Sequence, residues 1–479
     1  MYTKRAILWF RLDLRLHDNE ALHEALNSAD EVIPVYVFDE RTFFGKTHYF
    51  GFPKTGKFRA RFIIESVEEL RQSLRRLGSE LIVRVGKPEE EIFGIAKQAR
   101  SSWVFCNRER TAEEVKIQDA LEKNLWSIGQ EMRYSRGKLL YYTSDLPFPI
   151  QHTPDTFTQF RKEVERYVPV RSPLPVPAAL PSVTVALEPG EVPGLPCLGH
   201  EEFEPDPRSA FLFKGGESEG LRRLEYYIRG KELIDDFKES RDGMLGEDYS
   251  TKLSPWLAQG CLSPKMAYYE LRKHEEQYGR NKSTYEFFYY LMYRDFLRFM
   301  AKKYGNQIFF RTGPLNNGGP RWRNDWELLQ QWIEGRTGIP FIDANMREIR
   351  RTGYMSSRGR QNVASFLAHE LGVNWQMGAE YFESMLIDYD VASNWGNWNN
   401  IAGVGSDPRE ARNLNILSQA KAYDPKGDYV KRWLPELKSL PPEKVHQPGQ
   451  LSCSEQKELH LKIGDDYPEA MVDMDKWSS

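Results

Sequence analysis

Cysteine is scarce in this sequence, and no long hydrophobic run interrupts it. The chain holds 4 cysteines among 479 residues. They stand far apart without a CxxC pair, which excludes both a disulfide framework and a cysteine-rich zinc site. The apolar run in the opening MYTKRAILWFRLDLR is too short for a signal peptide or a membrane span. We therefore expect a cytoplasmic, soluble protein.

An excess of charge of either sign is missing as well. Lysine and arginine total 66 against 69 aspartate and glutamate, which leaves a formal net charge of −3. This near balance excludes a polycation, so contact with nucleic acid would have to come from a local basic patch. Aromatic residues, in contrast, make up 13% of the chain, with 12 tryptophans and 24 tyrosines. Large flat side chains build tight cores and also line sites for planar ligands.

Two periodicities alternate over residues 1–140. Short apolar runs typical of buried strands occupy 6–10, 32–38, 81–85 and 103–106. Apolar residues three or four apart predict helices over 58–77 and 112–125. This alternation indicates an α/β domain built on a doubly wound parallel sheet, with its ligand crevice at the carboxyl ends of the strands. No GxGxxG follows the first strand, so the usual glycine-rich dinucleotide site is not expected there.

The rest of the chain divides into three parts. Residues 141–207 form a predicted interdomain linker, because 168–207 contain ten of the 28 prolines and cannot form regular structure. Residues 208–440 lack strand patterns and predict a large all-α domain. Its helices are expected over 219–228, 265–277, 285–303, 326–334, 343–352, 362–371 and 378–386. Residues 441–479 would form a short polar C-terminal tail.

Two short motifs are ambiguous when taken alone. GFPKTGKF at 51–58 nearly matches a phosphate loop, but Phe58 lacks the hydroxyl that Mg²⁺ needs and Pro53 lacks an amide. Asp388 and Asp390 could bind a divalent metal, hold ribose hydroxyls or an exocyclic amine, pair with arginine, or lie in a solvated loop. The amide and indole groups of NWGNWNN at 394–400 follow at once. Their density suggests a site that binds and stacks a heteroaromatic ring.

Three further features also have plain structural interpretations. YSTKLSP at 249–255 places hydroxyls and a lysine just before a helix start, where they could hold a phosphate or merely cap the helix. Five arginines between 346 and 361 form a basic stripe, which is either a solvated helix face or a contact for a phosphate backbone. Trp322, Trp375 and Trp398, judged singly, are more typical of a core than of redox partners.

Longer strings resemble the photolyase and cryptochrome family. WFRLDLR at 9–15, with Asp18 and Asn19, is similar to that family's first strand–helix turn. FPKTG at 52–56 and TPDTFTQFR at 153–161 are similar to its DASH branch. The same pattern includes EGRTG at 334–338, NMRE at 345–348, RGRQNVAS at 358–365 and GVG at 403–405. The resemblance covers almost the whole chain.

The resemblance implies FAD in a U shape within the all-α domain and a folate antenna, usually 5,10-methenyltetrahydrofolate, near the α/β domain. Arg360 and Asp388 would pair beside the flavin ring, where fixed charge favours the reduced flavin. Asp390 would contact the flavin–adenine region, and Asn394 would face the flavin N5. Glu109 matches the acid expected at the pterin. Arg294 would lie near the loop that holds the FAD phosphates, which consists of Ser250, Thr251, Lys252, Leu253 and Ser254.

The three tryptophans fall on that family's electron-transfer chain, running from Trp398 through Trp375 to Trp322 near the surface. DNA, single-stranded or damaged, is the implied partner. The residues that match the DNA and lesion site are Tyr290, Tyr293, Gln361 and Arg358.

Four positions depart from the family pattern. Tyr290 stands in place of a glutamate that contacts the lesion, and Tyr293 in place of a tryptophan. Ser357 replaces an asparagine, and Phe237 replaces a tyrosine that commonly reaches an FAD phosphate. Loss of the carboxylate at 290 removes an acceptor that stabilises the flipped dimer.

Three functions follow as hypotheses. The first is a DASH-type cryptochrome, a blue-light-absorbing flavoprotein that acts as a photoreceptor and binds DNA. The second is light-driven repair of cyclobutane pyrimidine dimers in single-stranded DNA, as in a photolyase. The third is a nucleic-acid-binding module that acts independently of light and keeps FAD only for structure.

Overall fold

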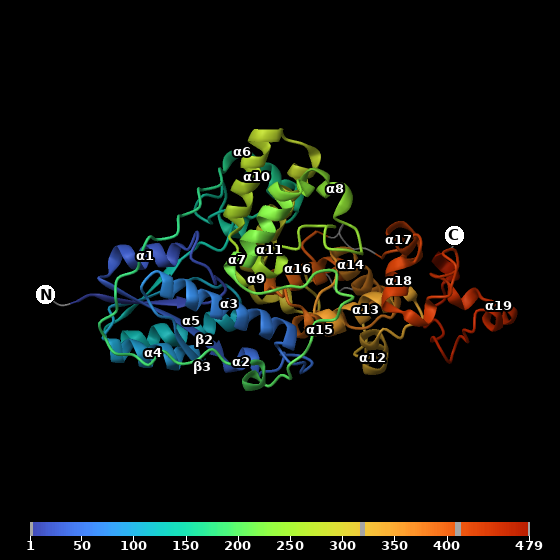
Figure 1. The fold of residues 1–479 in the computed structure, drawn as a ribbon, viewed down its shortest axis with the longest axis horizontal. Helices are drawn as coiled ribbons and strands as arrows, with labels where there is room; N and C mark the ends of the chain where they lie inside the picture. Colours follow the sequence, from blue (N-terminus) through green and yellow to red (C-terminus); the bar gives the residue numbers. More distant parts are fainter. Residues whose placement is uncertain (1–2, 317–320, 408–412, 478–479) are drawn as a thin grey trace.

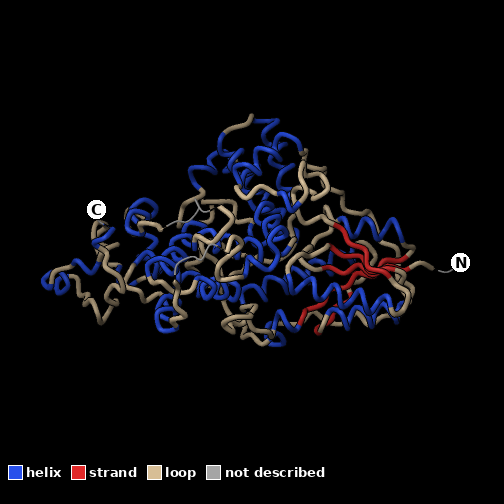
Figure 2. Tube along the Cα trace, turned by 180° about the vertical axis from the view of Figure 1, so that it is seen from behind, coloured by secondary structure: helices blue, strands red, loops and turns tan. Residues whose placement is uncertain are grey.

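A five-stranded parallel sheet forms the first part of the computed structural model, which describes residues 3–316, 321–407 and 413–477. The strands lie in the order β3-β2-β1-β4-β5 (Figures 1 and 2). Four of them match the predicted strands, and the fifth escaped prediction because EMRYS is largely polar and lies at the sheet edge. The strands are β1 (Arg5–Phe10), β2 (Glu31–Asp39), β3 (Ile82–Gly86), β4 (Trp103–Asn107) and β5 (Glu131–Ser135).

Helices cover both faces of this sheet. Alternate side chains of β1 point to opposite faces, so Leu8 and Phe10 join a core that includes α3, whereas Ile7 and Trp9 join a core with α4 and α5. This arrangement confirms the predicted α/β class. The helices of this domain are α1 (Glu20–Ser28), α2 (Glu40–Phe43), α3 (Lys57–Arg76), α4 (Pro88–Ala99) and α5 (Ala112–Trp126).

A buried polar clasp joins the loop after β1 to the helical half. Lys265 Nζ lies 2.7 Å from Asp18 Oδ1, with both side chains at most 1% exposed. Ser263 also donates to Asp18, and Arg15 Nη1 donates to Gly260 O at 2.8 Å. The motif that resembled a strand–helix turn therefore fixes how the two domains meet.

The segment 141–207 is only partly a linker. It contains α6 (Phe157–Tyr167), which packs into the helical half, with the Phe160 ring 5.4 Å from Phe296. The proline-rich part is extended and lies on the α/β domain, where Leu180 N donates to Leu77 O and Val83 N donates to Pro189 O. The proline-rich part is not wholly irregular, because Leu195–Leu198 form a short 3₁₀ helix, and the amphipathic α6 was not among the predicted helices.

The remainder is helical, as predicted, and lies beside the sheet domain (Figure 1). α11 is its longest helix and runs through its middle. The helices are α7 (Glu217–Glu225), α8 (Phe237–Ser240), α9 (Ser254–Gln259), α10 (Pro264–Tyr278), α11 (Lys282–Tyr304), α12 (Trp326–Glu334), α13 (Pro340–Thr352), α14 (Ser357–Ser365), α15 (Trp375–Met385), α16 (Val391–Ala402), α17 (Ile416–Tyr423) and α18 (Asp428–Trp433).

Residues 441–479 differ from the expected polar tail. Tyr467 is fully buried, and its hydroxyl donates to Asp343 Oδ2 at 2.6 Å. Leu451 and Trp477 also belong to the helical core, and the segment includes α19 (Cys453–Glu458). The buried apolar residues of this segment are widely spaced, so they form no periodic pattern from which their packing could be predicted. None of the helices in the described part of the chain has the length and apolarity needed to cross a membrane.

Candidate functional site

The loop before α9 has the backbone of an anion site. Ser250 and Lys252 both adopt left-handed conformations with φ of 60°. Residues that alternate between left- and right-handed conformations direct successive N–H groups to one side, which creates a concave anion-binding surface. Arg223 supports the loop from within, since Nε donates to Thr251 O at 3.0 Å and Nη2 to Glu247 O at 2.7 Å.

Lys252 adds a buried positive charge to this loop. Its side chain is 2% exposed, and Nζ donates to Tyr249 O at 3.1 Å. Across the described ranges no carboxylate lies within ion-pair distance of it. Burial, reinforced by Arg223, holds the pKa of Lys252 well below its usual range. A buried amine without a carboxylate partner is protonated most readily next to an anion, so it fits the phosphates of a dinucleotide.

An arginine–carboxylate pair joins α14 to the loop before α16. Arg360 Nη2 donates to Asp388 Oδ2 at 2.9 Å, and Arg360 Nε donates to Met355 O. Burial alone would lower the pKa of Arg360, but Asp388 and Tyr354 raise it above its usual value. The second oxygen, Asp388 Oδ1, is buried without a hydrogen-bond partner, as is the Tyr249 hydroxyl. Unsatisfied buried acceptors and donors are expected where a polar ligand completes the site.

α16 carries two further predicted site residues. Asp390 caps this helix, because its carboxylate accepts from Ser393 N at 2.9 Å. Asn394 is 8% exposed and donates from Nδ2 to Ala379 O at 3.0 Å. Asn394 and Trp398 are four residues apart on α16 and therefore share one face.

Asp390 and Arg294 have contacts that the sequence did not indicate. The Asp390 carboxylate lies 2.5 Å from Arg298 Nη2, on the wall of a pocket between the domains. Burial would raise the pKa of Asp390, but Arg298 and Arg294 lower it to about 2. Arg294 donates to Leu257 O of α9 at 2.9 Å and so braces the helix behind the phosphate loop. Contacts of Asp390 or Arg294 with a dinucleotide stay predictions.

All three predicted electron-transfer tryptophans are buried in one hydrophobic core. The exposed fractions are 3% for Trp398, 0% for Trp375 and 5% for Trp322, so Trp322, which was expected near the surface, is almost fully buried. Trp375 Nε1 donates to Arg311 O and Trp322 Nε1 to Ala368 O, both at 3.1 Å. These hydrogen bonds hold the Trp375 and Trp322 indoles in fixed positions, and packing holds Trp398.

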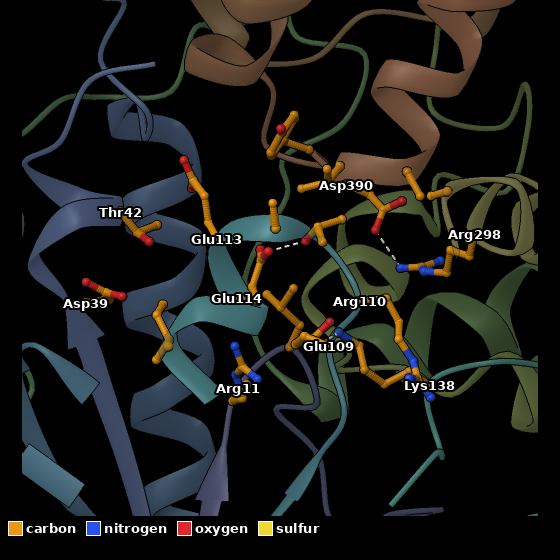
Figure 3. Close-up of a pocket in the computed structure, with 18 of the residues that line it drawn as sticks. Arg11, Asp39, Thr42, Glu109, Arg110, Glu113, Glu114, Lys138, Arg298 and Asp390 are labelled. Carbon is orange, nitrogen blue, oxygen red and sulfur yellow. Dashed lines mark hydrogen bonds and ion pairs between the residues drawn. The ribbon is translucent and has the colours of Figure 1, made fainter. Parts of the chain in front are cut away.

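A pocket of about 550 Å³ opens between the domains (Figure 3). On one side it is lined by residues that follow β1, β2, β4 and β5, at the carboxyl ends of the strands, as the sequence predicted. Glu109 faces it and pairs with Lys138. Burial raises the pKa of Glu109, but Lys138 and Arg11 outweigh this and lower it. Burial and Glu109 raise the pKa of the neighbouring Glu114.

Four cations in this pocket were missed by the sequence analysis. Arg108, Arg110, Arg136 and Lys302 line it, and none of the ion pairs among the described residues involves them. Burial and the three arginines lower the pKa of Lys302 to about 8. Three separate segments contribute these residues, so no local motif could have revealed the cluster.

Two of the predicted lesion residues, Tyr290 and Gln361, lie next to arginines, whereas Tyr293 contacts an asparagine. The Arg241 guanidinium lies 4.8 Å from the Tyr290 ring, and burial raises the pKa of Tyr290 to about 12. Arg358 donates to Asp242 at 2.8 Å and to Gln361 at 3.1 Å. Asn400 donates to the Tyr293 hydroxyl at 3.2 Å. Contact of these residues with DNA stays a prediction.

The remaining motifs have structural roles. Arg347 pairs with Glu436 at 2.6 Å, so the basic stripe is neither wholly solvated nor wholly available for phosphates. The near phosphate loop at 51–58 packs closely, because a Cβ on Gly56 would lie 2.3 Å from Ser384 O. Throughout the described residues, no group of three or more His, Cys, Asp or Glu could hold a metal, Asp388 and Asp390 included.

Two family models match this chain. The model described as DNA photolyase matches residues 6–179, and the model described as the FAD binding domain of DNA photolyase matches residues 287–479. The second match extends over the C-terminal segment, in keeping with the packing of 441–477 into the helical domain. A curated relative named Cryptochrome DASH from Gloeobacter violaceus is 49% identical, over 99% of this chain and 94% of that protein.

Solved structures agree with these matches. The crystal structure of a Synechocystis cryptochrome superposes with a TM-score of 0.95 at 45% identity, covering 100% of this chain and 98% of that one. A class III photolyase from Agrobacterium tumefaciens has a TM-score of 0.85 at 27% identity, covering 100% of this chain and 96% of that one. The chain is therefore an FAD-binding flavoprotein of the photolyase and cryptochrome family, and within it belongs to the DASH cryptochromes.

Proposed function

We propose that this protein is a blue-light photoreceptor in which its own tryptophans supply an electron to FAD. The observation that supports this most strongly is the arrangement around α16. Asp388 precedes the helix, and Asn394 and Trp398 lie on one of its faces, so one short segment supplies a paired carboxylate, an amide and an indole, each at most 8% exposed. When bound, FAD supplies a one-electron oxidant that light excites.

The chain's own groups would bind and orient the cofactor. Ser250, Thr251 and Lys252, followed by Leu253 and Ser254, would hold the two phosphates through backbone amides and the buried ammonium. Arg360 would keep positive charge next to the flavin ring, and Asp388 Oδ1 would accept a hydrogen bond from the flavin. Asn394 would adjust its amide to the protonation state of N5.

Trp398 would donate the electron. Trp375 would then donate an electron to the oxidised Trp398, and Trp322 would donate one to the oxidised Trp375. Each step moves positive charge away from the cofactor, which delays recombination. Apolar packing excludes water around all three indoles, so competing reactions are suppressed.

The pocket between the domains would hold a folate antenna, such as 5,10-methenyltetrahydrofolate. Glu109 stays ionised between Lys138 and Arg11, so it can accept hydrogen bonds from a pterin. The pocket is also walled by Trp395, Tyr389 and Phe309, which suit a flat ring.

We also propose that the protein is cytoplasmic and that it binds single-stranded or damaged DNA.

An absorption experiment tests the proposed photoreception. Purified protein should show flavin absorbance, and blue light with an external reductant should bleach it. Full flavin occupancy without any bleaching would contradict the proposal and favour the hypothesis of a module that acts independently of light. In that case nucleic-acid binding should fall steeply with salt and be the same in darkness and light.

Dimer repair is the second candidate, favoured by the structural similarity to a photolyase. Tyr290 offers a ring and a hydroxyl where a carboxylate is expected, with Arg241 against it. We expect little loss of pyrimidine dimers when reduced protein is illuminated with a dimer-containing oligonucleotide. A Tyr290→Glu variant should gain repair, with Tyr289→Glu as the control on the same helix. Turnover of dimers by the unaltered protein would contradict the assignment as a pure receptor.

A further inference from the structure

A series of contacts leads away from Trp375 toward the interdomain pocket. The Trp395 ring stands edge-on to Trp375, with 5.7 Å between centroids and 77° between planes. Trp395 Nε1 donates to the Tyr389 hydroxyl at 3.4 Å, and that hydroxyl donates to Glu383 Oε2 at 2.8 Å. Trp395, Tyr389 and Glu383 all line the pocket, whereas Trp375 lies behind them in the core.

The groups around Tyr389 are suited to removing its proton. Burial raises the pKa of Glu383 to about 7, even though Tyr389, Arg59 and Lys54 each lower it. A carboxylate of that strength is an effective base near neutral pH. The Arg59 guanidinium lies 4.9 Å from the centre of the Tyr389 ring. A positive charge there disfavours a cation on the ring, so Tyr389 can lose an electron only together with its proton.

We infer that Tyr389 is a terminal electron donor on a branch that leaves the tryptophan chain at Trp375, with Glu383 as its proton acceptor. This inference rests on the proposed photoreception, in which photoexcited FAD is the oxidant. Trp375, once it lacks an electron, takes one from Trp395, and Trp395 takes one from Tyr389. The phenolic O–H bond breaks, and the proton moves along the existing hydrogen bond to Glu383 Oε2. The products are a neutral tyrosyl radical, a neutral carboxylic acid and restored tryptophans.

Tyr381 shows why the proton acceptor decides the outcome. It lies on α15, as Glu383 does, and its ring stands 5.7 Å from Trp332. Its hydroxyl, however, is buried without a hydrogen-bond partner. Oxidation of Tyr381 would leave a buried charge with nowhere to send the proton, which is costly. Both tyrosines stand near a tryptophan, but only Tyr389 also has a base.

The branch would move the oxidising equivalent out of the core without leaving a charge behind. A neutral radical at Tyr389 attracts the returning electron less than a tryptophan cation does, so the charge-separated state lasts longer. The radical would also stand on the wall of the pocket, next to any molecule bound there.

The test is electron paramagnetic resonance of the FAD-loaded full chain, frozen after a blue flash. Protein with ring-deuterated tyrosine identifies a tyrosyl signal by its altered splitting. Tyr389→Phe and Glu383→Gln should each lower the tyrosyl yield about tenfold or more, because one lacks the donor and the other lacks the base. Trp395→Phe should lower it too, while tryptophan radicals persist. Tyr381→Phe is the matched control and should leave the yield unchanged.

A second measurement separates this inference from the proposed photoreception. Azide radicals, generated by pulse radiolysis in darkness, oxidise tryptophans without any flavin. The slow conversion of tryptophan to tyrosine radicals should again decrease in Tyr389→Phe and Glu383→Gln but not in Tyr381→Phe. Flavin bleaching without a tyrosyl signal, or equal losses in Tyr389→Phe and Tyr381→Phe, would overturn the branch alone. Absence of any flash-induced bleaching would overturn the photoreception, and the azide result would then decide the branch by itself.

Discussion

Arg360 donates to only one oxygen of Asp388, at 2.9 Å, and leaves the other oxygen buried and unsatisfied. An unsatisfied buried carboxylate oxygen costs free energy in a protein without its ligand. A cofactor that donates to this oxygen removes that cost. The pair is therefore a binding element for FAD as well as a source of fixed charge.

Replacement of Asp388 by Ala should weaken FAD retention. Arg360, whose side chain is 26% exposed, would then lose its charged partner, and the loss of one charge-assisted hydrogen bond typically costs about 1.5–3 kcal/mol. Flavin absorbance per protein after exhaustive dialysis measures the loss. Glu436→Ala, which breaks the partly exposed Arg347–Glu436 pair, is the control and should keep its flavin. Equal flavin content in both variants would argue against a role of the Asp388 carboxylate.

Replacement of Glu109 by Gln should weaken folate binding without affecting FAD. Lys138 and Arg11 would then face the pocket without a carboxylate between them, and the pterin would lose a charged acceptor. We expect a loss of affinity of about tenfold or more, equivalent to about 1.4 kcal/mol. Fluorescence titration with methenyltetrahydrofolate measures it. Glu113→Gln, at a largely exposed position in the same pocket, should bind almost normally, and identical titrations would exclude Glu109 from the site.

The clasp between the domains should dominate their mutual stability. Lys265→Met leaves Asp18 as a buried, unpaired carboxylate and should lower the free energy of unfolding by about 3–5 kcal/mol. Lys273→Met breaks an exposed pair with Glu270 and should change it by less than about 1 kcal/mol. Urea unfolding of the FAD-loaded proteins gives both values. A small effect at Lys265 would mean that the other contacts between the domains, rather than the clasp, stabilise their arrangement.

Glu348 should make the protein less stable as the pH rises. Burial raises its pKa from 4.5 to about 7, so the folded state binds the proton more tightly than the unfolded state. The stabilisation is complete below about pH 4.5 and decreases by about 1.4 kcal/mol per pH unit until about pH 7. Glu348→Gln should flatten this decrease in urea unfolding between pH 5 and 7, to the extent that Glu348 causes it. An unchanged slope would show that other groups, such as Glu383, account for it.

Sequence periodicity was enough for the elements whose composition agrees with their structure. The strands at 6–10 and 32–38 are apolar throughout, and 326–334 has the period of a helix from end to end. α16 was not predicted from the sequence, because half of VASNWGNWNNIA consists of glycine, serine and asparagine, which are poor helix formers. Its stability comes from the Asp390 cap, from packing against the preceding helix α15, and from packing against α11, which is remote in sequence.

The candidate site, too, was predicted only in part. Arg360 and Asp388 are 28 residues apart, and their pairing followed from a family resemblance rather than from spacing. The cations Arg108, Arg136 and Lys302 come from both domains, so only the folded chain brings them together. Contacts of this kind depend on how two domains dock, which local sequence does not encode.

The rate of flavin photoreduction in Trp398→Phe tests the central claim most directly. Trp433→Phe is the matched control, since Trp433 is equally buried in the same core but lies on α18, outside the predicted chain. Absorption spectra recorded during blue illumination should show normal photoreduction in the control and a rate lower by about tenfold or more in Trp398→Phe, with FAD still bound. Equal rates in the two variants would contradict electron transfer through Trp398.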